Sequence, residues 1–188
     1  MNNSTATLRY SVDAWDCIVA VNGEWDRFAR ANDAPPELYS EMIMERKIWD
    51  FISSEPLLHV YRRILDRVRA GNSFEFDFRC DSAALRRYLV LRVRPLGGGG
   101  AEFETRTVRT EERVFQPLLT KDSPKREGIV VACSWCNKFK TGDDAWLEAE
   151  EAVTVLNLFD DGPVPKLSHG MCAKCYDAVV SAAEARAA

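Results

Sequence analysis

The hydrophobic residues of the N-terminal half follow two different periods. Apolar and polar side chains alternate from Phe74 to Asp81, from Tyr88 to Arg94 and from Glu102 to Val108, which predicts three strands. Each strand has one apolar face, which is typical of an antiparallel sheet with one side buried. An earlier strand is predicted over residues 15–21, ending at Asn22-Gly23, with Trp15, Cys17, Val19 and Val21 on one face.

Two helices are expected between the first strand and the other three. Trp25, Phe28 and Ala29 share one face of a short helix. A longer helix begins after Ser54 as N-cap and ends at Gly71. Its apolar residues recur at helical spacing: Leu57, Val60, Tyr61, Ile64, Leu65 and Val68. The order of a strand, helices and a meander predicts an α+β fold, in which helices cover one face of the sheet.

The C-terminal third contains two Cys-x-x-Cys pairs, Cys133/Cys136 and Cys172/Cys175. Two residues between the cysteines let one tight turn aim both sulfurs at a single ion, so four thiolates predict a closed, structural zinc site. We expect a strand or hairpin over Trp146–Leu158 between the pairs. A helix is expected after Cys175. Together these elements predict a treble-clef-like zinc module.

His169 lies three residues before Cys172. It has two alternative roles: it replaces one cysteine as a metal ligand, or it donates a hydrogen bond to a thiolate from outside the ligand shell. Because four cysteines already fill a tetrahedral shell, we expect the second role.

The chain divides at a polar stretch that contains a proline. We predict a first domain over residues 8–112, a linker over 113–127 and a zinc module over 128–188. The whole chain has 188 residues, of which 46% are hydrophobic and 29% charged, and a net charge of -4, so it is expected to fold. From Glu127 onward the net charge is -5, while the residues before it carry +1.

The first domain resembles a PAS sensory domain. The similarity rests on Cys17-Ile-Val-Ala-Val-Asn22, the Trp25 helix, Ile48-Trp-Asp-Phe-Ile52, the helix ending at Gly71 and the three closing strands. The resemblance implies a five-stranded antiparallel sheet with flanking helices around a central cavity. It also implies a small ligand or a protein as partner, and it allows a homodimer formed through this domain.

Several residues of this domain are candidates for binding or redox chemistry. Aromatic side chains could line an apolar ligand pocket, although an ordinary core is the simpler expectation; they are Trp15, Trp25, Phe28, Trp49, Phe76 and Phe78. The thiol of Cys80 has arginines nearby, which would favour a redox-active thiolate, but its strand phase predicts a buried core thiol. Haem and flavin are not expected, because His59 lies at the edge of the helical apolar face and the flavin-photoreceptor cysteine motif is absent from the sequence.

The turn between Arg79 and Arg87 is strongly charged. Arg79, Asp81, Arg86 and Arg87 bracket it. We expect a solvated hairpin; the alternatives are a local salt-bridge network, or a patch that meets a partner or the second domain.

The second domain is similar to a small cysteine-rich module of bacterial signalling proteins that contain PAS or receiver domains. The similarity rests on Val131-Ala-Cys-Ser-Trp-Cys-Asn-Lys-Phe-Lys140, Trp146-Leu-Glu148 and Ser168-His-Gly-Met-Cys-Ala-Lys-Cys175. It implies a bacterial regulatory context and does not itself supply an activity.

These features together predict a sensory or regulatory protein that acts by binding a small ligand or a protein partner. The alternative is a nucleic-acid-binding regulator with a zinc finger, but the acidic zinc module lacks the basic surface that phosphates require. No catalytic constellation is recognisable, so we expect no enzyme. The absence of an apolar run of ~20 residues and of a signal peptide predicts a cytoplasmic protein without a membrane span.

Overall fold

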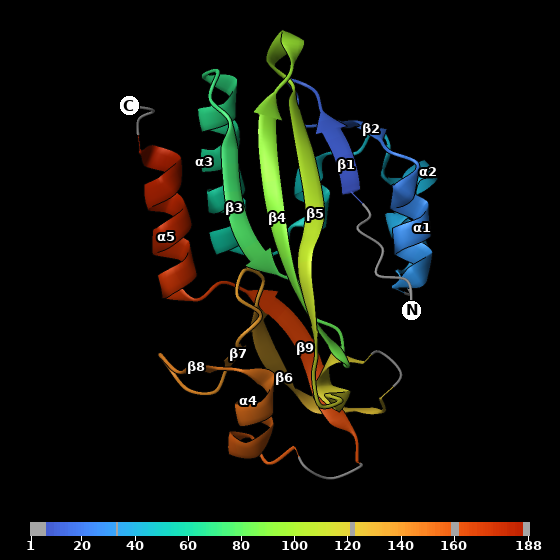
Figure 1. Ribbon diagram of the computed structural model, residues 1–188, viewed down its shortest axis with the longest axis vertical. Coiled ribbons are helices and arrows are strands. Elements are labelled where there is room, and N and C mark those ends of the chain that lie inside the picture. The colour runs from blue at the N-terminus through green and yellow to red at the C-terminus, as the bar shows by residue number, and fades with distance from the viewer. Residues whose placement is uncertain (1–6, 33, 121–122, 159–161, 186–188) are drawn as a thin grey trace. The chain divides into compact units, whose positions relative to one another are not determined.

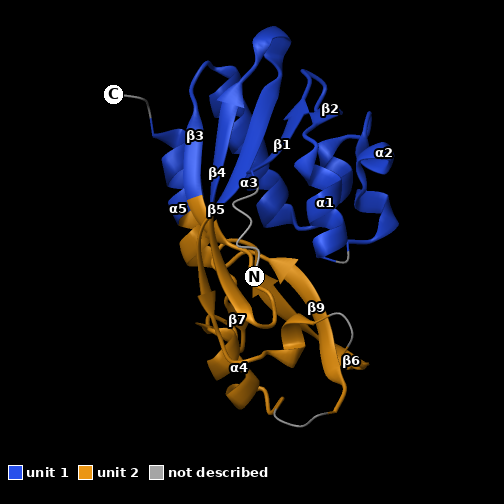
Figure 2. Ribbon diagram, turned by 45° about the vertical axis from the view of Figure 1, so that its right-hand side comes forward, with its two compact units in different colours: residues 1–76, 90–107, 178–188 blue, residues 77–89, 108–177 orange. Residues whose placement is uncertain are grey.

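The computed structural model describes residues 7–32, 34–120, 123–158 and 162–185. Two residues of the expected linker, 121 and 122, and the N-terminal residues 1–6 lie outside the described part. Contacts divide the chain into two compact units (Figure 2). Unit 1 comprises residues 1–76, 90–107 and 178–188, and unit 2 comprises residues 77–89 and 108–177.

The first sheet has five strands in the order β2-β1-β5-β4-β3 (Figure 1). The strands are β1 (Thr7–Val12), β2 (Ile18–Val21), β3 (Phe74–Arg79), β4 (Leu85–Pro95) and β5 (Ala101–Glu112). Strand β1 pairs antiparallel with both β2 and β5. The fold is therefore mixed α+β with a five-stranded antiparallel sheet, as expected, although β1 is a strand that the sequence pattern did not reveal.

In the part of the chain that the structure describes, three α-helices that belong entirely to unit 1 lie between β2 and β3. They are α1 (Glu24–Ala31), the short α2 (Ser40–Ile43) and α3 (Glu55–Arg69). Helix α3 begins after Ser54 and has a proline in its first turn, where the missing N–H costs no hydrogen bond. Val60, Ile64, Leu65 and Val68 are buried, so the predicted helix and its apolar face are confirmed.

The predicted phase of the strand over residues 15–21 is wrong. Trp15 is 73% exposed and Val19 is also exposed, whereas Ile18 is only 4% exposed. The cause is a turn before the strand, in which the Asp13 carboxylate accepts hydrogen bonds from the backbone N–H groups of Trp15 and Cys17. Because β2 starts only at Ile18, the alternation of residues 15–17 does not decide which of its side chains are buried. A shift by one residue moves each side chain to the opposite face of the sheet.

The sheet of unit 2 has four strands in the order β8-β7-β6-β9. They are β6 (Lys125–Cys133), β7 (Phe139–Lys140), β8 (Trp146–Leu147) and β9 (Val164–Gly170), and β9 runs parallel to β6. The buried faces of these strands contribute Val130, Phe139 and Val164 to a hydrophobic core that also includes Leu118. The remaining helix, α5 (Ala173–Glu184), has residues 173–177 in unit 2 and residues 178–184 in unit 1.

The expected strand or hairpin over Trp146–Leu158 is mostly a helix. Only β8 is extended, and α4 (Ala149–Val155) follows it directly. Glu148 and Glu151 form a capping box, in which each side chain accepts a hydrogen bond from the backbone of the other residue. Ala149 and Ala152 are buried one turn apart and form the apolar face of the helix, while the capping box supplies hydrogen-bond acceptors at its N-terminus.

The stretch predicted as a linker contributes to the core of unit 2. Leu118 is buried in the short 3-10 helix Pro117–Leu119, and Gln116 is a buried polar residue. Strand β6 already begins at Lys125. Residues 113–127 are therefore polar in composition but include buried side chains. The predicted domain limits stay a prediction. Among the described residues, no helix is long and apolar enough to span a membrane.

Candidate metal centre

The four cysteines of the two Cys-x-x-Cys pairs come together in unit 2. The sulfur atoms of Cys133, Cys136, Cys172 and Cys175 all lie within 4.8 Å of one another. The Sγ atoms of Cys136 and Cys172 are 3.9 Å apart. Cys133 and Cys172 are buried, while Cys136 and Cys175 are partly exposed. The sequence prediction of one four-cysteine cluster is thus supported by its geometry.

The first pair lies on a tight turn between β6 and β7. The backbone N–H of Cys133 donates to the carbonyl oxygen of Lys138, and the N–H of Asn137 donates to the carbonyl oxygen of Cys133, at 2.8 and 2.9 Å. Asn137 has φ 58°, a left-handed conformation that asparagine adopts more readily than most residues. This turn reverses the chain immediately after Cys136 and holds both sulfurs on one side.

The second pair is positioned by the parallel pairing of β6 with β9. In this register Cys133 lies opposite Gly170, two residues before Cys172. The N–H of Ser134 donates to the carbonyl oxygen of Gly170 at 2.9 Å, which ties the turn to the end of β9. Cys172 then precedes α5 and Cys175 lies in its first turn, where free N–H groups and the helix dipole favour thiolates.

The donor set fits zinc. Four ligands at the Zn–S distance of ~2.3 Å around a tetrahedron lie ~3.8 Å apart, close to the separation of Cys136 and Cys172. The backbone N–H of Cys172 also donates to the sulfur of Cys133 at 3.4 Å, as expected beside a buried thiolate. Four thiolates leave no coordination position for water, so such a site is structural.

The protonation of the thiols depends strongly on their neighbours. Hydrogen bonds from the Cys136 and Cys175 thiols lower the pKa of Cys133 far below that of an ordinary cysteine. The same contact with Cys133 raises the pKa of Cys136 to about 11 and also raises the pKa of Cys175. Without a metal, the protein groups therefore favour a thiolate at Cys133 and protonated thiols at its neighbours. A bound divalent cation would favour the thiolate form of all four cysteines.

The other candidate residues for metal or redox chemistry lie outside this cluster. His169 is exposed on β9, and within the described residues the group of donors contains the four cysteines alone. Its expected role beside a thiolate stays a prediction. Cys80 is exposed rather than buried in the core, because β3 ends at Arg79 and the strand phase no longer applies. Packing around its sulfur nevertheless raises its pKa, which disfavours a reactive thiolate.

The aromatic residues proposed for a ligand pocket do not form one group. Trp15 is on the surface, while the indole N–H of Trp25 donates to the carbonyl oxygen of Leu38 at 2.8 Å. The indole N–H of Trp49 donates to the carboxylate of Asp16, also at 2.8 Å.

The remaining members of the proposed set are also dispersed. Phe76 packs on Phe74, with ring centroids 5.4 Å apart, and Phe28 is half-buried in α1. Phe78 belongs to unit 2. In unit 1, Trp25 instead packs edge-on against Tyr10, and Tyr10 stacks on Phe103 at 4.6 Å.

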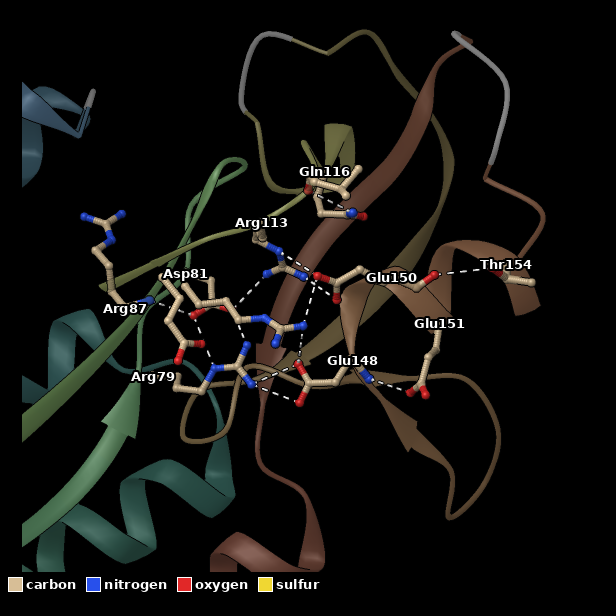
Figure 3. A network of polar contacts seen from close by, with 12 residues as sticks. Arg79, Asp81, Arg87, Arg113, Gln116, Glu148, Glu150, Glu151 and Thr154 are labelled. Carbon is tan, nitrogen blue, oxygen red and sulfur yellow. Dashed lines mark hydrogen bonds and ion pairs between the residues drawn. The ribbon is translucent and has the colours of Figure 1, made fainter. Parts of the chain in front are cut away.

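A partly buried network of charges lies elsewhere in unit 2, with Asp81 and Arg113 at its buried centre (Figure 3). It links the β3–β4 turn and the end of β5 to the start of α4 through six residues: Arg79, Arg86, Arg113, Asp81, Glu148 and Glu150. Arg113 donates hydrogen bonds to the carboxylates of Asp81 at 2.9 Å and of Glu150 at 3.1 Å. Only 2% of the arginine side chain and none of the aspartate side chain is exposed. The expectation of a solvated hairpin is therefore wrong. The turn residues form an ion-pair network that is only partly local, because it extends to Glu148 and Glu150 of the predicted second domain.

The network shifts the pKa values of Arg79 and Glu150 in the direction that favours their charged forms. Desolvation opposes the charge of Arg79, but hydrogen bonds to Asp81 and Glu148 outweigh it and raise the pKa of Arg79. Desolvation likewise opposes the charge of Glu150, but its backbone N–H and Arg113 lower the pKa of that carboxyl. Three cations thus balance three anions in a place where an unbalanced charge would be costly.

Comparisons with models of known protein families and with curated protein sequences find no match for this chain. The four cysteines are nevertheless the part of the site that the sequence identified fully. The charge network was recognisable only in the turn residues Arg79 to Arg86, because its partners Arg113, Glu148 and Glu150 are distant in the chain.

Proposed function

We propose that this chain is a bacterial sensory or regulatory protein, with a PAS-like domain that binds a small ligand or protein and a zinc module that relays its state through protein contacts. The observation that carries the proposal is the four-sulfur cluster, in which all donor atoms lie within 4.8 Å of one another. A closed site of this kind supports a fold and leaves no position for catalysis.

Zinc would stabilise unit 2 because the cysteines come from distant parts of its sheet. Cys133 ends β6 and Cys136 follows in the turn, whereas Cys172 and Cys175 lie at the start of α5. One ion would hold these ends together and would neutralise thiolates that otherwise repel one another. In a small module with a limited core, metal binding is folding free energy.

Metal removal tests this part of the proposal. We expect about one zinc per chain by elemental analysis, and loss of unit 2 structure in chelator as measured by near-ultraviolet circular dichroism of its tryptophans. Cys136→Ser should lower zinc content and stability, while the matched variant Cys17→Ser should retain both, because Cys17 is not in the cluster. A metal-free protein that is fully folded would refute the structural role.

The sensory role is supported by the architecture of the first sheet and its helices. A five-stranded antiparallel sheet with helices α1, α2 and α3 between its second and third strands agrees with the fold that the PAS resemblance implies. An aromatic group surrounds Phe103, and burial raises the pKa of Tyr61 to about 12. Buried hydroxyls among aromatic rings suit recognition of a small, mostly apolar ligand.

The ligand of unit 1 is open to direct measurement. Native mass spectrometry and an absorption spectrum of freshly purified protein would detect a retained small molecule. Tyr61→Phe should weaken binding of that molecule without changing zinc content, because Tyr61 lies in unit 1. If neither a small ligand nor a protein partner that engages unit 1 is found, the sensory proposal fails while the zinc site stands.

A further inference from the structure

A pocket of about 430 Å³ opens beside the cysteine cluster within unit 2. Cys136 and Cys175, the two partly exposed cysteines, form one end of it. Its volume falls within the range of small-molecule sites in proteins. The pocket is distinct from the aromatic group around Phe103, which belongs to unit 1.

The walls of this pocket are mainly apolar. Phe78 from β3, Tyr88 from β4 and Trp135 from the turn after β6 supply aromatic surface. Val108 on β5 adds an aliphatic side chain that is half-exposed at the pocket. Rigid aromatic walls with an exposed apolar side chain favour a ligand with a flat or branched apolar body.

Two arginines flank the Tyr88 ring at the same pocket. The guanidinium carbon of Arg109 is 4.0 Å from the ring centroid and that of Arg79 is 5.7 Å away. Arg79 is held by Asp81 and Glu148. Arg109 is 58% exposed, and among the described residues it forms an ion pair with the partly exposed Glu111. Glu111 also accepts a hydrogen bond from the Tyr88 hydroxyl at 2.9 Å, so it keeps a partner when Arg109 turns to a ligand. A surface ion pair of this kind costs little to exchange.

The other charges near the pocket leave Arg109 available for an anion. Asp77 is the carboxylate residue among those that line the pocket, and it is exposed to solvent. Lys138, Lys174 and Asp144 line a second pocket on the cysteines, where the two lysine charges would offset that of metal-bound thiolates. An anionic group at the rim would therefore meet a guanidinium, and an apolar body would fill the interior.

We propose that this pocket binds a small amphipathic anion, with an aromatic or branched apolar body against Phe78, Tyr88 and Trp135 and its carboxylate or sulfonate on Arg109. The site is independent of the sensory role proposed for unit 1. It places a ligand against the exposed side of the metal centre.

A matched pair of fluorescent probes tests the proposal on the full, zinc-loaded chain. 8-Anilinonaphthalene-1-sulfonate carries the anion, and N-phenyl-1-naphthylamine has the same body without it. We expect saturable binding of the sulfonate at one site. Arg109→Gln should weaken the sulfonate about tenfold, the effect of one charge-assisted hydrogen bond, and leave the neutral probe unchanged. Arg106→Gln, an exposed arginine on the same strand that is absent from the lining, should change neither.

A bulky side chain introduced into the pocket provides a second test of the proposal. Val108→Trp should weaken both probes at least tenfold, while Val114→Trp, the same kind of change at an exposed site outside the lining, should not. Zinc content and circular dichroism establish that each variant is folded; if Val108→Trp is not, Val108→Phe replaces it. The proposal is overturned by the absence of saturable sulfonate binding, by equal behaviour of the two valine variants, or by equal behaviour of the two arginine variants.

Discussion

Replacing Arg113 with methionine should destabilise unit 2 through one uncompensated buried charge. In the native network three arginines balance three carboxylates, and Arg113 contacts both Asp81 and Glu150. Methionine fills similar space without the charge, so two arginines then face three carboxylates. Asp81 has no exposed side-chain surface and cannot turn to water.

The expected loss follows from the burial of each partner. Breaking a buried ion pair by removing one member costs about 3–5 kcal/mol. Arg79 still pairs with Asp81 and Arg86 still pairs with Glu150, which is partly exposed, so we expect the lower end, about 3 kcal/mol. With a urea m-value of roughly 1–3 kcal/mol/M, the midpoint should fall by ~1–3 M.

Urea unfolding of the zinc-saturated protein, followed by tryptophan fluorescence and circular dichroism, measures this loss. The control is Arg126→Met, because Arg126 is an exposed arginine of β6 in the same unit, and its loss should change stability by less than ~0.5 kcal/mol. Adding Asp81→Asn to Arg113→Met should recover part of the stability, since it restores the charge balance. Equal stabilities of the two arginine variants, or a double variant that is weaker by the sum of both losses, would refute the electrostatic reasoning.

Two further changes probe the turn of the first cysteine pair and the acid sensitivity of the network. Asn137→Val should lower the free energy of unfolding by about 1–2 kcal/mol, because a β-branched residue resists the left-handed φ of 58°. Asn137→Gly should be nearly neutral, because glycine adopts this conformation readily. In competition with a zinc chelator, only the valine variant should retain the metal more weakly. The lowered pKa of Glu150 means that its charge stabilises the fold above the ordinary carboxyl pKa of ~4.3, and that this contribution is lost as the pH falls through its lower native value. The stability difference between the wild type and Glu150→Gln should therefore shrink below about pH 4 in urea titrations with zinc content measured at each pH, and a difference independent of pH would contradict this explanation.

Local signals predicted the elements whose formation depends on their own residues. The N-cap, the first-turn proline and the apolar face of α3 all lie between Ser54 and Gly71, so this stretch alone was enough to predict the helix. The cysteine spacing predicted the ligand set in the same way. Strand β1 was missed because Leu8 and Tyr10 form only a short pattern between polar residues, and its position between β2 and β5 is set by partners elsewhere in the chain.

Other predictions from the sequence were wrong because the structures concerned depend on contacts between distant segments. The polar stretch 113–127 resembles a linker in composition, yet Leu118 joins the core of unit 2 and Arg113 joins the buried network. Residues 15–21 have a strand-like alternation, but the turn at Asp13 sets where pairing starts and hence which face is buried. Helix α4 begins after Glu148, which is not a usual N-cap residue, so its capping box with Glu151 is recognisable only in the structure.

The sequence by itself determined which chemistry this protein can carry: four cysteines at ligand spacing, an acidic C-terminal third and an N-terminal half of alternating strands around an amphipathic helix. The tertiary structure decided which of these residues meet. Parallel pairing of β6 with β9 brings Cys172 beside Cys133, and the end of β5 brings Arg113 to Asp81. Spacing and periodicity act over a few residues, whereas burial and charge balance depend on groups that only folding brings within a few ångströms of one another.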